Sequence, residues 1–89
     1  MVSEKVIVPN KLGLHLRPAG ELCKAALKYS SKVTFTIGTS TANAKSVLGV
    51  LAARVQCGDE IELICEGDDE IEALAGLKGL IQSGLGEDE

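Results

Sequence analysis

Polar and apolar residues alternate along residues 32–37 and 60–66 of the chain. Successive side chains of a strand point to opposite faces, so this alternation predicts two half-buried strands. A short apolar run at residues 5–8 predicts a further strand. Residues 41–43, which follow a turn at residues 38–41, are a candidate for a fourth and shorter strand.

The period of the pattern changes between the first two strands. From about residue 16 to about residue 29, apolar side chains recur three and four positions apart, which predicts a helix with one buried face. Pro18 has no backbone N–H and fits only in the first turn of a helix. We therefore expect His15 at the N-cap of this helix or just before it. The residues of the buried face are Ala19, Leu22, Cys23 and Ala26.

Two more helices are expected in the second half of the chain. Ser46 can cap a short helix at residues 47–53, because its hydroxyl can accept a hydrogen bond from the first turn. Asp68 or Asp69 can cap a last helix, and the chain is expected to fray from Gly84 onward. The apolar stripe predicted for the last helix consists of Ile71, Leu74, Leu77 and Ile81.

The order of these elements, β-α-β-β-α-β-α, predicts an α+β fold. One sheet of four strands is expected to be covered on one face by the helices. With one Phe, one Tyr and no Trp, the core must be built mostly from Val, Ile, Leu and Ala. We find no repeat or linker that would divide the chain, so residues 1–89 are expected to form a single domain.

The composition limits the partners that the chain can bind. A net charge of −4 argues against nucleic acid and against anionic membrane surfaces. Cys23, Cys57 and Cys65 are odd in number and lack a paired spacing, which indicates free thiols rather than disulfides or a zinc site. The sequence shows neither a signal peptide nor an apolar run of membrane-spanning length. We therefore expect a cytoplasmic protein without a metal ion or cofactor.

The residues around His15 indicate phosphoryl-group chemistry. A helix N-terminus presents unpaired N–H groups and a partial positive charge, so it attracts anions. Leu16 and Arg17 can direct N–H groups at whatever the imidazole carries, and the Arg17 side chain suits phosphate. Imidazole is nucleophilic near neutral pH and is a good leaving group from phosphorus. Without a second acid, base or metal ligand nearby, the site favours a carrier over a hydrolase. An ordinary surface histidine is the alternative.

Ser46 and the apolar residues after it also have two interpretations. Ser46 is either a simple helix cap or a site where phosphorylation adds charge to a helix N-terminus, and the residues alone favour the cap. A helix of about two turns cannot bury every apolar side chain in its sequence. The exposed parts of Val47, Leu48 and Leu51 are therefore a candidate docking patch, and core packing is the alternative.

Two segments of the chain resemble a known family. Residues 10–19, Asn-Lys-Leu-Gly-Leu-His-Leu-Arg-Pro-Ala, resemble the active-site segment of the HPr family. These are the histidine-containing phosphocarriers of the phosphoenolpyruvate-dependent phosphotransferase system. Residues 44–49 resemble the second signature of that family, and the resemblance extends over essentially the whole chain. It implies an open-faced β-sandwich with an antiparallel sheet. It also implies that Enzyme I phosphorylates His15 at Nδ1, that Arg17 stabilises the phosphate, and that an acceptor domain of the IIA type receives it.

The resemblance has further implications for regulation and for partners. Ser46 matches the regulatory serine that a dedicated HPr kinase/phosphorylase modifies in some bacteria. Leu16 stands where the family has a small residue, so it is a candidate partner contact. Arg54 stands where sugar-transport members have Gly, and is a candidate second cation for the phosphate. Residues 10–13 and 82–85 resemble the nitrogen-branch relatives. Sugar uptake, nitrogen-branch regulation and a docking module controlled by the serine thus remain alternatives. We expect a monomer.

Overall fold

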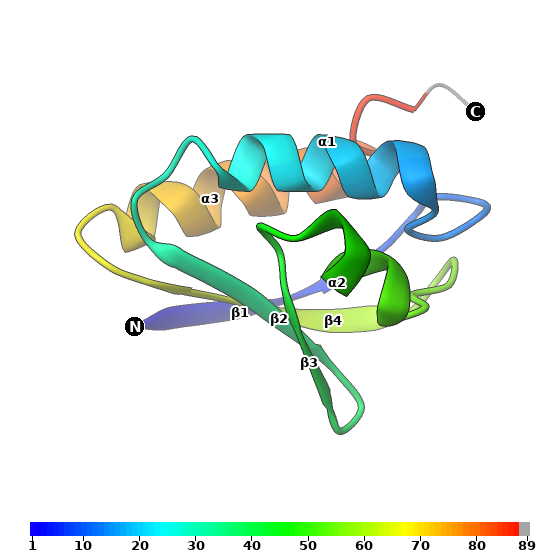
Figure 1. Cartoon of the computed structure of the whole chain (residues 1–89), viewed down its shortest axis with the longest axis horizontal. Coiled ribbons are helices and arrows are strands. Elements are labelled where there is room, and N and C mark those ends of the chain that lie inside the picture. The colour runs from blue at the N-terminus through cyan, green and yellow to red at the C-terminus, as the bar shows by residue number, and fades with distance from the viewer. Residues whose placement is uncertain (88–89) are drawn as a thin grey trace.

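The computed structural model describes residues 1–87, and their elements follow the predicted order. The strands and helices are β1 (Val2–Ile7), α1 (Leu16–Ala26), β2 (Lys32–Ile37), β3 (Ser40–Asn43), α2 (Val47–Ala52), β4 (Glu60–Glu66) and α3 (Glu70–Gln82). The four strands form one antiparallel sheet in the order β1-β4-β2-β3. Figure 1 shows the three helices on the same side of this sheet. The predicted α+β fold is therefore confirmed.

The core lies between the sheet and the helices. Val33 and Phe35 of β2, with Ile61 and Leu63 of β4, are buried, as their alternation predicts. Burial of such a side chain contributes about 1.5–3 kcal/mol, so this layer stabilises the fold. The predicted buried face of α1 is confirmed, since the buried residues of that helix include Ala19, Leu22, Cys23 and Ala26.

The boundaries of β1 and α1 differ most from the prediction, and β3 begins at Ser40 rather than at residue 41. β1 begins at Val2 rather than at residue 5, because its polar residues pair with β4 while their side chains stay exposed. Such an edge strand has no apolar alternation that the sequence could reveal. α1 ends at Ala26 rather than near residue 29, and Leu27, which follows it, is exposed.

The buried face of α3 differs in part from the predicted stripe. Ile71 is 71% exposed, so its place in the stripe was wrong, and Leu74 is only partly buried. Ala73, Leu77 and Ile81 are buried, and their spacing of four residues puts them on one face of the helix. This face packs against β1 and β4. The prediction did not include Ala73, whose small apolar side chain is fully buried.

The prediction that the chain frays from Gly84 is wrong for residues 84–87. Gly84 has a φ of +92°, and its N–H donates to the oxygen of Ile81 at 3.1 Å. The N–H of Leu85 donates to the oxygen of Leu80 at 3.0 Å. These two hydrogen bonds form a Schellman ending, in which a glycine follows the helix and an apolar residue packs back on it. Leu85 is accordingly buried. The last two residues lie outside the described part of the chain.

Candidate functional site

The loop that leads to His15 is held against the segment after α2. Gly13 has a φ of +67°, and a Cβ atom there would lie 2.1 Å from the backbone oxygen of Val55. Only glycine fits, because it lacks a Cβ and adopts positive φ without strain. The N–H of Leu14 donates to the same oxygen at 3.0 Å, and the Leu14 side chain is buried. These contacts fix the backbone that precedes His15.

His15 is the N-cap residue of α1, as the sequence predicts. Its carbonyl accepts a hydrogen bond from the N–H of Ala19 at 2.9 Å, but its side chain makes no capping hydrogen bond. The N–H groups of Leu16 and Arg17 precede this first helical hydrogen bond, so the helix does not satisfy them. Pro18 has no N–H to offer. Within residues 1–87 the N–H groups of Leu16 and Arg17 have no hydrogen-bond acceptor. His15 therefore lies at the positive end of the helix dipole, two residues before the exposed Arg17.

The imidazole contacts the C-terminal segment of the chain. Its Nε2 lies 2.8 Å from Oε2 of Glu87, and Oε1 of Glu87 accepts a hydrogen bond from Nδ2 of Asn10 at 2.7 Å. The hydrogen bond from Asn10 holds the pKa of Glu87 below its usual range. Partial burial opposes this effect, and the hydrogen bond and charge of His15 and the charge of Arg17 add to it. Glu87 is therefore an ionised hydrogen-bond acceptor near neutral pH.

Asn10 joins the histidine loop, residues 8–15, to the C-terminal segment, residues 84–87. It is buried, and its Nδ2 also donates to the oxygen of Gly84 at 2.9 Å. Since two acceptors face one nitrogen, this orientation of the amide is the one that the contacts require. Within residues 1–87, its Oδ1 is buried and has no hydrogen-bond partner.

Neither Asn10 nor Glu87 was predicted from the sequence. The expectation that no second acid lies near His15 was wrong, because the Glu87 carboxylate contacts the imidazole. The available signal was the apolar Leu85 between two glycines, which predicts a fixed helix ending rather than a frayed one.

Ser46 is the N-cap residue of α2, which confirms the predicted cap. Its Oγ accepts a hydrogen bond from the N–H of Gly49 at 3.1 Å. A Cβ at Gly49 would lie 3.3 Å from the same Oγ, so the small residue leaves room for the serine. The hydroxyl of Ser46 is thus committed to the helix, unlike the imidazole of His15.

The four predicted docking residues differ in the apolar surface that they offer. Leu16, in the first turn of α1, is 67% exposed, and Leu48, on α2, is 80% exposed. Val47 and Leu51 are partly buried against the core, so core packing accounts for part of their surface. α1 and α2 pack against each other on one side of the sheet (Figure 1). Leu16 and Leu48 therefore present exposed apolar side chains from two neighbouring helices.

Arg54 follows α2 in an unusual backbone conformation. Its φ is +54°, in the left-handed region that favours glycine. Its N–H donates to the oxygen of Leu51 at 3.2 Å, and its carbonyl accepts from Nε2 of Gln56 at 3.2 Å. Among the described residues, none of its hydrogen bonds involves His15. Support of a phosphate by Arg54 therefore stays a prediction.

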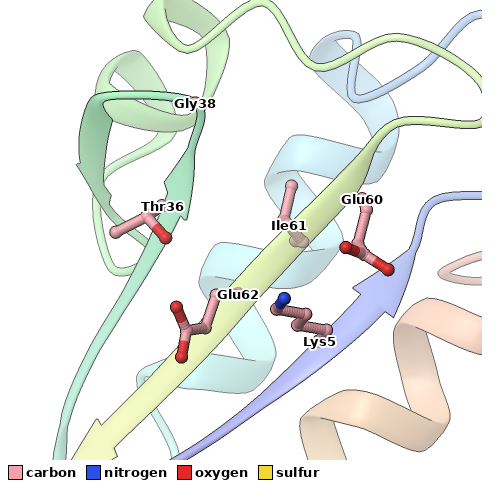
Figure 2. Close-up of a pocket in the computed structure, with 6 residues that line it drawn as sticks. All are labelled: Lys5, Thr36, Gly38, Glu60, Ile61 and Glu62. Carbon is pink, nitrogen blue, oxygen red and sulfur yellow. The ribbon is translucent and has the colours of Figure 1, made fainter.

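A shallow groove lies on the sheet away from these residues. Lys5 and Thr36 are both register partners of Glu62, so the groove follows the sheet surface across three strands. Figure 2 shows acidic and basic side chains along it. None of the candidate site residues takes part. The residues that line it are Lys5, Thr36, Gly38, Glu60, Ile61 and Glu62.

Other groups with possible chemistry are few. All three cysteines are free; Cys23 and Cys65 are buried, whereas Cys57 is exposed. Burial, and then the charges of Asp69 and Glu70, raise the pKa of the Cys65 thiol, which keeps it protonated. In the described part of the chain, no three His, Cys, Asp or Glu side chains are grouped to hold a metal ion. Within residues 1–87, none of the helices has the length and apolar character needed to cross a membrane.

Comparisons with known proteins agree with this fold and with the resemblance. A family profile described as "PTS HPr component phosphorylation site" matches residues 2–83. The phosphocarrier protein HPr of Treponema pallidum (strain Nichols) is 42% identical over 83 residues, covering 93% of this chain and 94% of the relative. The crystal structure of HPr-C-His from Thermoanaerobacter tengcongensis has a TM-score of 0.94 at 38% identity, and 100% of each chain is covered. A crystal structure of an HPr dimer from the same organism has a TM-score of 0.77 at 39% identity, covering 98% of this chain and 100% of that chain.

Proposed function

Because this chain belongs to the HPr family, the histidine-containing phosphocarriers of the phosphoenolpyruvate-dependent phosphotransferase system, we propose that its phosphoryl group is carried on Nδ1 of His15. Membership of the family implies partners within that system, such as Enzyme I and IIA-type domains. Enzyme I is the donor and a IIA-type domain the acceptor. Arg17 and the N–H groups of Leu16 and Arg17 bind the phosphoryl oxygens.

The observation that carries this proposal is the open N-terminus of α1 at His15. The imidazole is partly exposed and makes no capping hydrogen bond, so a partner can reach it. A phosphoryl group brings negative charge, which the helix N-terminus and the Arg17 guanidinium stabilise. The imidazole nitrogen forms a bond to phosphorus that it also releases readily, which suits transfer in both directions.

Incubation with Enzyme I and radiolabelled phosphoenolpyruvate tests the proposal. We expect an acid-labile label on His15 that passes to a IIA domain. His15→Ala should take up no label and should keep the circular dichroism spectrum of the folded protein, because only the backbone of His15 takes part in the helix. An equal label on His15→Ala, or an acid-stable label on the wild type, would contradict the proposal.

Ser46 is a second site that we propose, for regulation by an HPr kinase/phosphorylase. The support is its position at a helix N-terminus, where a phosphate group is electrostatically tolerated, beside the exposed Leu48. Incubation with such a kinase and labelled ATP should give an acid-stable label that Ser46→Ala abolishes. An undiminished label on Ser46→Ala would exclude Ser46 as the site. Phosphorylation of Ser46 could also control the docking of partner proteins on α2, which is the alternative function.

We propose that Leu16 and Leu48, with the exposed parts of Val47 and Leu51, contact the partner proteins. The support is their exposed apolar surface near the two helix N-termini. Leu48→Ser should raise the concentration of Enzyme I needed for half-maximal transfer without changing the stability.

Transfer to IIA domains of the sugar branch and of the nitrogen branch, measured in competition, distinguishes sugar uptake from regulation. Arg54 remains a proposed second cation for the phosphate.

The wider setting of the protein is also proposed. We expect residues 1–89 to act as one domain and as a monomer, although an HPr relative has been crystallised as a dimer. Light scattering at micromolar concentration should give the mass of one chain, 9.3 kDa. Three free cysteines and partners that use phosphoenolpyruvate favour the cytoplasm. Fractionation of cells that express the protein tests that location.

A further inference from the structure

A strap, residues 84–87, is held against the histidine loop in one conformation. Three successive residues from Gly84 onward have positive φ, of 92°, 54° and 80°. For a side chain such as Leu85 this region is strained, and it persists only where the surroundings determine it. The burial of Leu85, the hydrogen bond from Asn10 to Gly84 and a turn closed by the Glu87 N–H to the Gly84 oxygen at 3.0 Å determine it. The strap therefore presents Glu87 at a fixed place.

At the end of the strap, Glu87 forms a pair with His15. The Glu87 side chain is 12% exposed and that of His15 is 36% exposed, with 2.8 Å between Oε2 and Nε2. A carboxylate only accepts hydrogen bonds, so a neutral imidazole in this pair carries its proton on Nε2 and keeps the lone pair on Nδ1. We infer that Glu87 is a positioning residue for phosphoryl transfer, which selects Nδ1 of His15 as the acceptor atom. This inference rests on the proposed function of His15.

The pair lets the phosphoryl group move without a proton transfer at the reacting nitrogen. Nδ1 forms the N–P bond with its lone pair, and the donor atom of Enzyme I takes the electron pair of the bond that breaks. The imidazole ring becomes positively charged, with its proton still on Nε2 and paired with the Glu87 carboxylate. On delivery to the acceptor, the electron pair of the N–P bond returns to Nδ1 and a neutral imidazole remains. Glu87 thus stabilises the charged ring that the transfer creates.

Three charged or polar groups surround the carboxylate. Asn10 donates to Oε1, His15 contacts Oε2, and the charge of Arg17 acts on the same carboxylate. A glutamine at this position keeps the shape of the side chain but removes its charge. Its amide can also donate to Nε2, which would favour the tautomer with the proton on Nδ1. Glu87→Gln therefore removes the selection while leaving the buried Leu85 anchor in place.

The test combines a spectroscopic and a kinetic measurement. Side-chain nitrogen chemical shifts of His15 are recorded at about pH 9, above the ordinary imidazole pKa. Phosphoryl acceptance is measured with Enzyme I and labelled phosphoenolpyruvate. Glu72→Gln, at an exposed glutamate in the first turn of α3, is the matched control. In the wild type and the control, we expect the shift of a lone-pair nitrogen at Nδ1 and of an N–H nitrogen at Nε2. In Glu87→Gln the two shifts should converge and acceptance should slow about tenfold.

Wild-type shifts together with a wild-type rate in Glu87→Gln would overturn the inference. A slower rate with unchanged shifts would also overturn it, because the effect would then lie in partner binding. Altered shifts with an unchanged rate would show that the tautomer does not limit transfer, which is equally contrary to it. In all three cases the label stays on His15 and the proposed function stands. Absence of label from the wild type would instead contradict the proposed function itself.

Discussion

The N-termini of α1 and α2 share a backbone arrangement but differ in what their N-cap side chains do. His15 and Ser46 are both extended, and the carbonyl of each accepts a helical hydrogen bond of 2.9 Å. At α2, the Ser46 hydroxyl binds the N–H of the third helical residue, Gly49. At α1 the third residue is Pro18, which has no N–H, and the imidazole turns instead to Glu87. One helix end is closed by its cap residue, and the other is left open.

This difference separates stability from function at the two helix ends. A side-chain cap typically contributes about 1 kcal/mol. α2 has 6 residues and depends on such a contribution, because short helices are marginal. α1 has 11 residues and a fully buried face, so it remains stable with an open N-terminus. The N–H groups that α1 leaves unpaired and an imidazole that does not cap the helix are the features that phosphoryl transfer requires.

The largest loss of stability is expected where the loop before His15 can no longer pack against the backbone of Val55. Gly13→Ala places a Cβ against the Val55 oxygen and should lower the free energy of unfolding by about 3 kcal/mol. It should also reduce phosphoryl acceptance, because His15 is displaced. Gly38→Ala is the matched control, since Gly38 has a φ of +59° but open space around it, and should cost only about 1 kcal/mol. Urea unfolding measures both variants, and equal losses would contradict the role given to Val55.

Substitution of Ser46 tests the side-chain cap at the N-terminus of α2. Ser46→Ala removes the cap and should lower the free energy of unfolding by about 1 kcal/mol. Ser46→Asp keeps a capping oxygen and should preserve stability. Its charge should slow transfer from Enzyme I about fivefold, which corresponds to a surface charge interaction of ~1 kcal/mol. Rates are measured at subsaturating Enzyme I. An unchanged rate in Ser46→Asp would leave Ser46 as a helix cap alone.

At the N-terminus of α3, the side chain of the N-cap residue also bonds away from its own helix. Asp69 makes no side-chain cap and accepts hydrogen bonds from the N–H groups of Ser30 and Ser31 and from the Ser31 hydroxyl. The Ser31 hydroxyl and then the Ser30 N–H lower the pKa of Asp69 from 3.8 to about 2. Because the folded state has the lower pKa, this contribution to stability is present above the ordinary pKa and is lost as the pH falls to about 2.

Asp69→Asn should therefore lose stability at neutral pH and show a shallower decline in the free energy of unfolding as acid is added toward pH 2. The measurement is urea unfolding at a series of pH values. Asp68→Asn, at the exposed neighbouring position, serves as the control and should keep the wild-type slope. The same slope for both variants would contradict the assignment of the acid sensitivity to Asp69.

The smallest change in stability is expected at Arg54, which follows the C-terminus of α2. Arg54 has a left-handed backbone that glycine adopts without strain, so Arg54→Gly should raise the free energy of unfolding by about 0.5–1 kcal/mol. Thermal unfolding tests this, and a less stable variant would contradict it. If the guanidinium also supports the phosphate, the phosphohistidine should hydrolyse faster in Arg54→Gly. An unchanged lifetime would exclude that second role.

The regular parts of the fold were predictable because their signals are local. The alternation around Phe35 and Leu63 and the helical spacing from Ala19 to Ala26 place each residue by its neighbours in the sequence. The error at Ile71 arose because the stripe was assigned from large side chains, whereas the small Ala73 is the residue that is buried there. The polar part of β1 was missed because an edge strand is held by backbone pairing rather than by an apolar face.

The part of the site that could be predicted also had local signals in the sequence. His15, Arg17 and Ser46 could be placed because a proline in the first turn and a serine before an apolar run mark helix starts. The contact of Asn10 with Glu87 joins residues separated by 77 positions, and no periodic pattern predicts such a pair. The requirement for glycine at position 13 likewise depends on Val55, which only the folded chain brings near.

Nδ1 of His15 is the proposed acceptor of the phosphoryl group at the N-terminus of α1. The most direct measurement is nitrogen–phosphorus coupling by NMR in nitrogen-15-labelled protein, phosphorylated with Enzyme I and phosphoenolpyruvate. We expect coupling between phosphorus and Nδ1 of His15, while Nε2 keeps its proton beside Glu87. Coupling to Nε2, or phosphate on the Ser46 hydroxyl in place of His15, would contradict it.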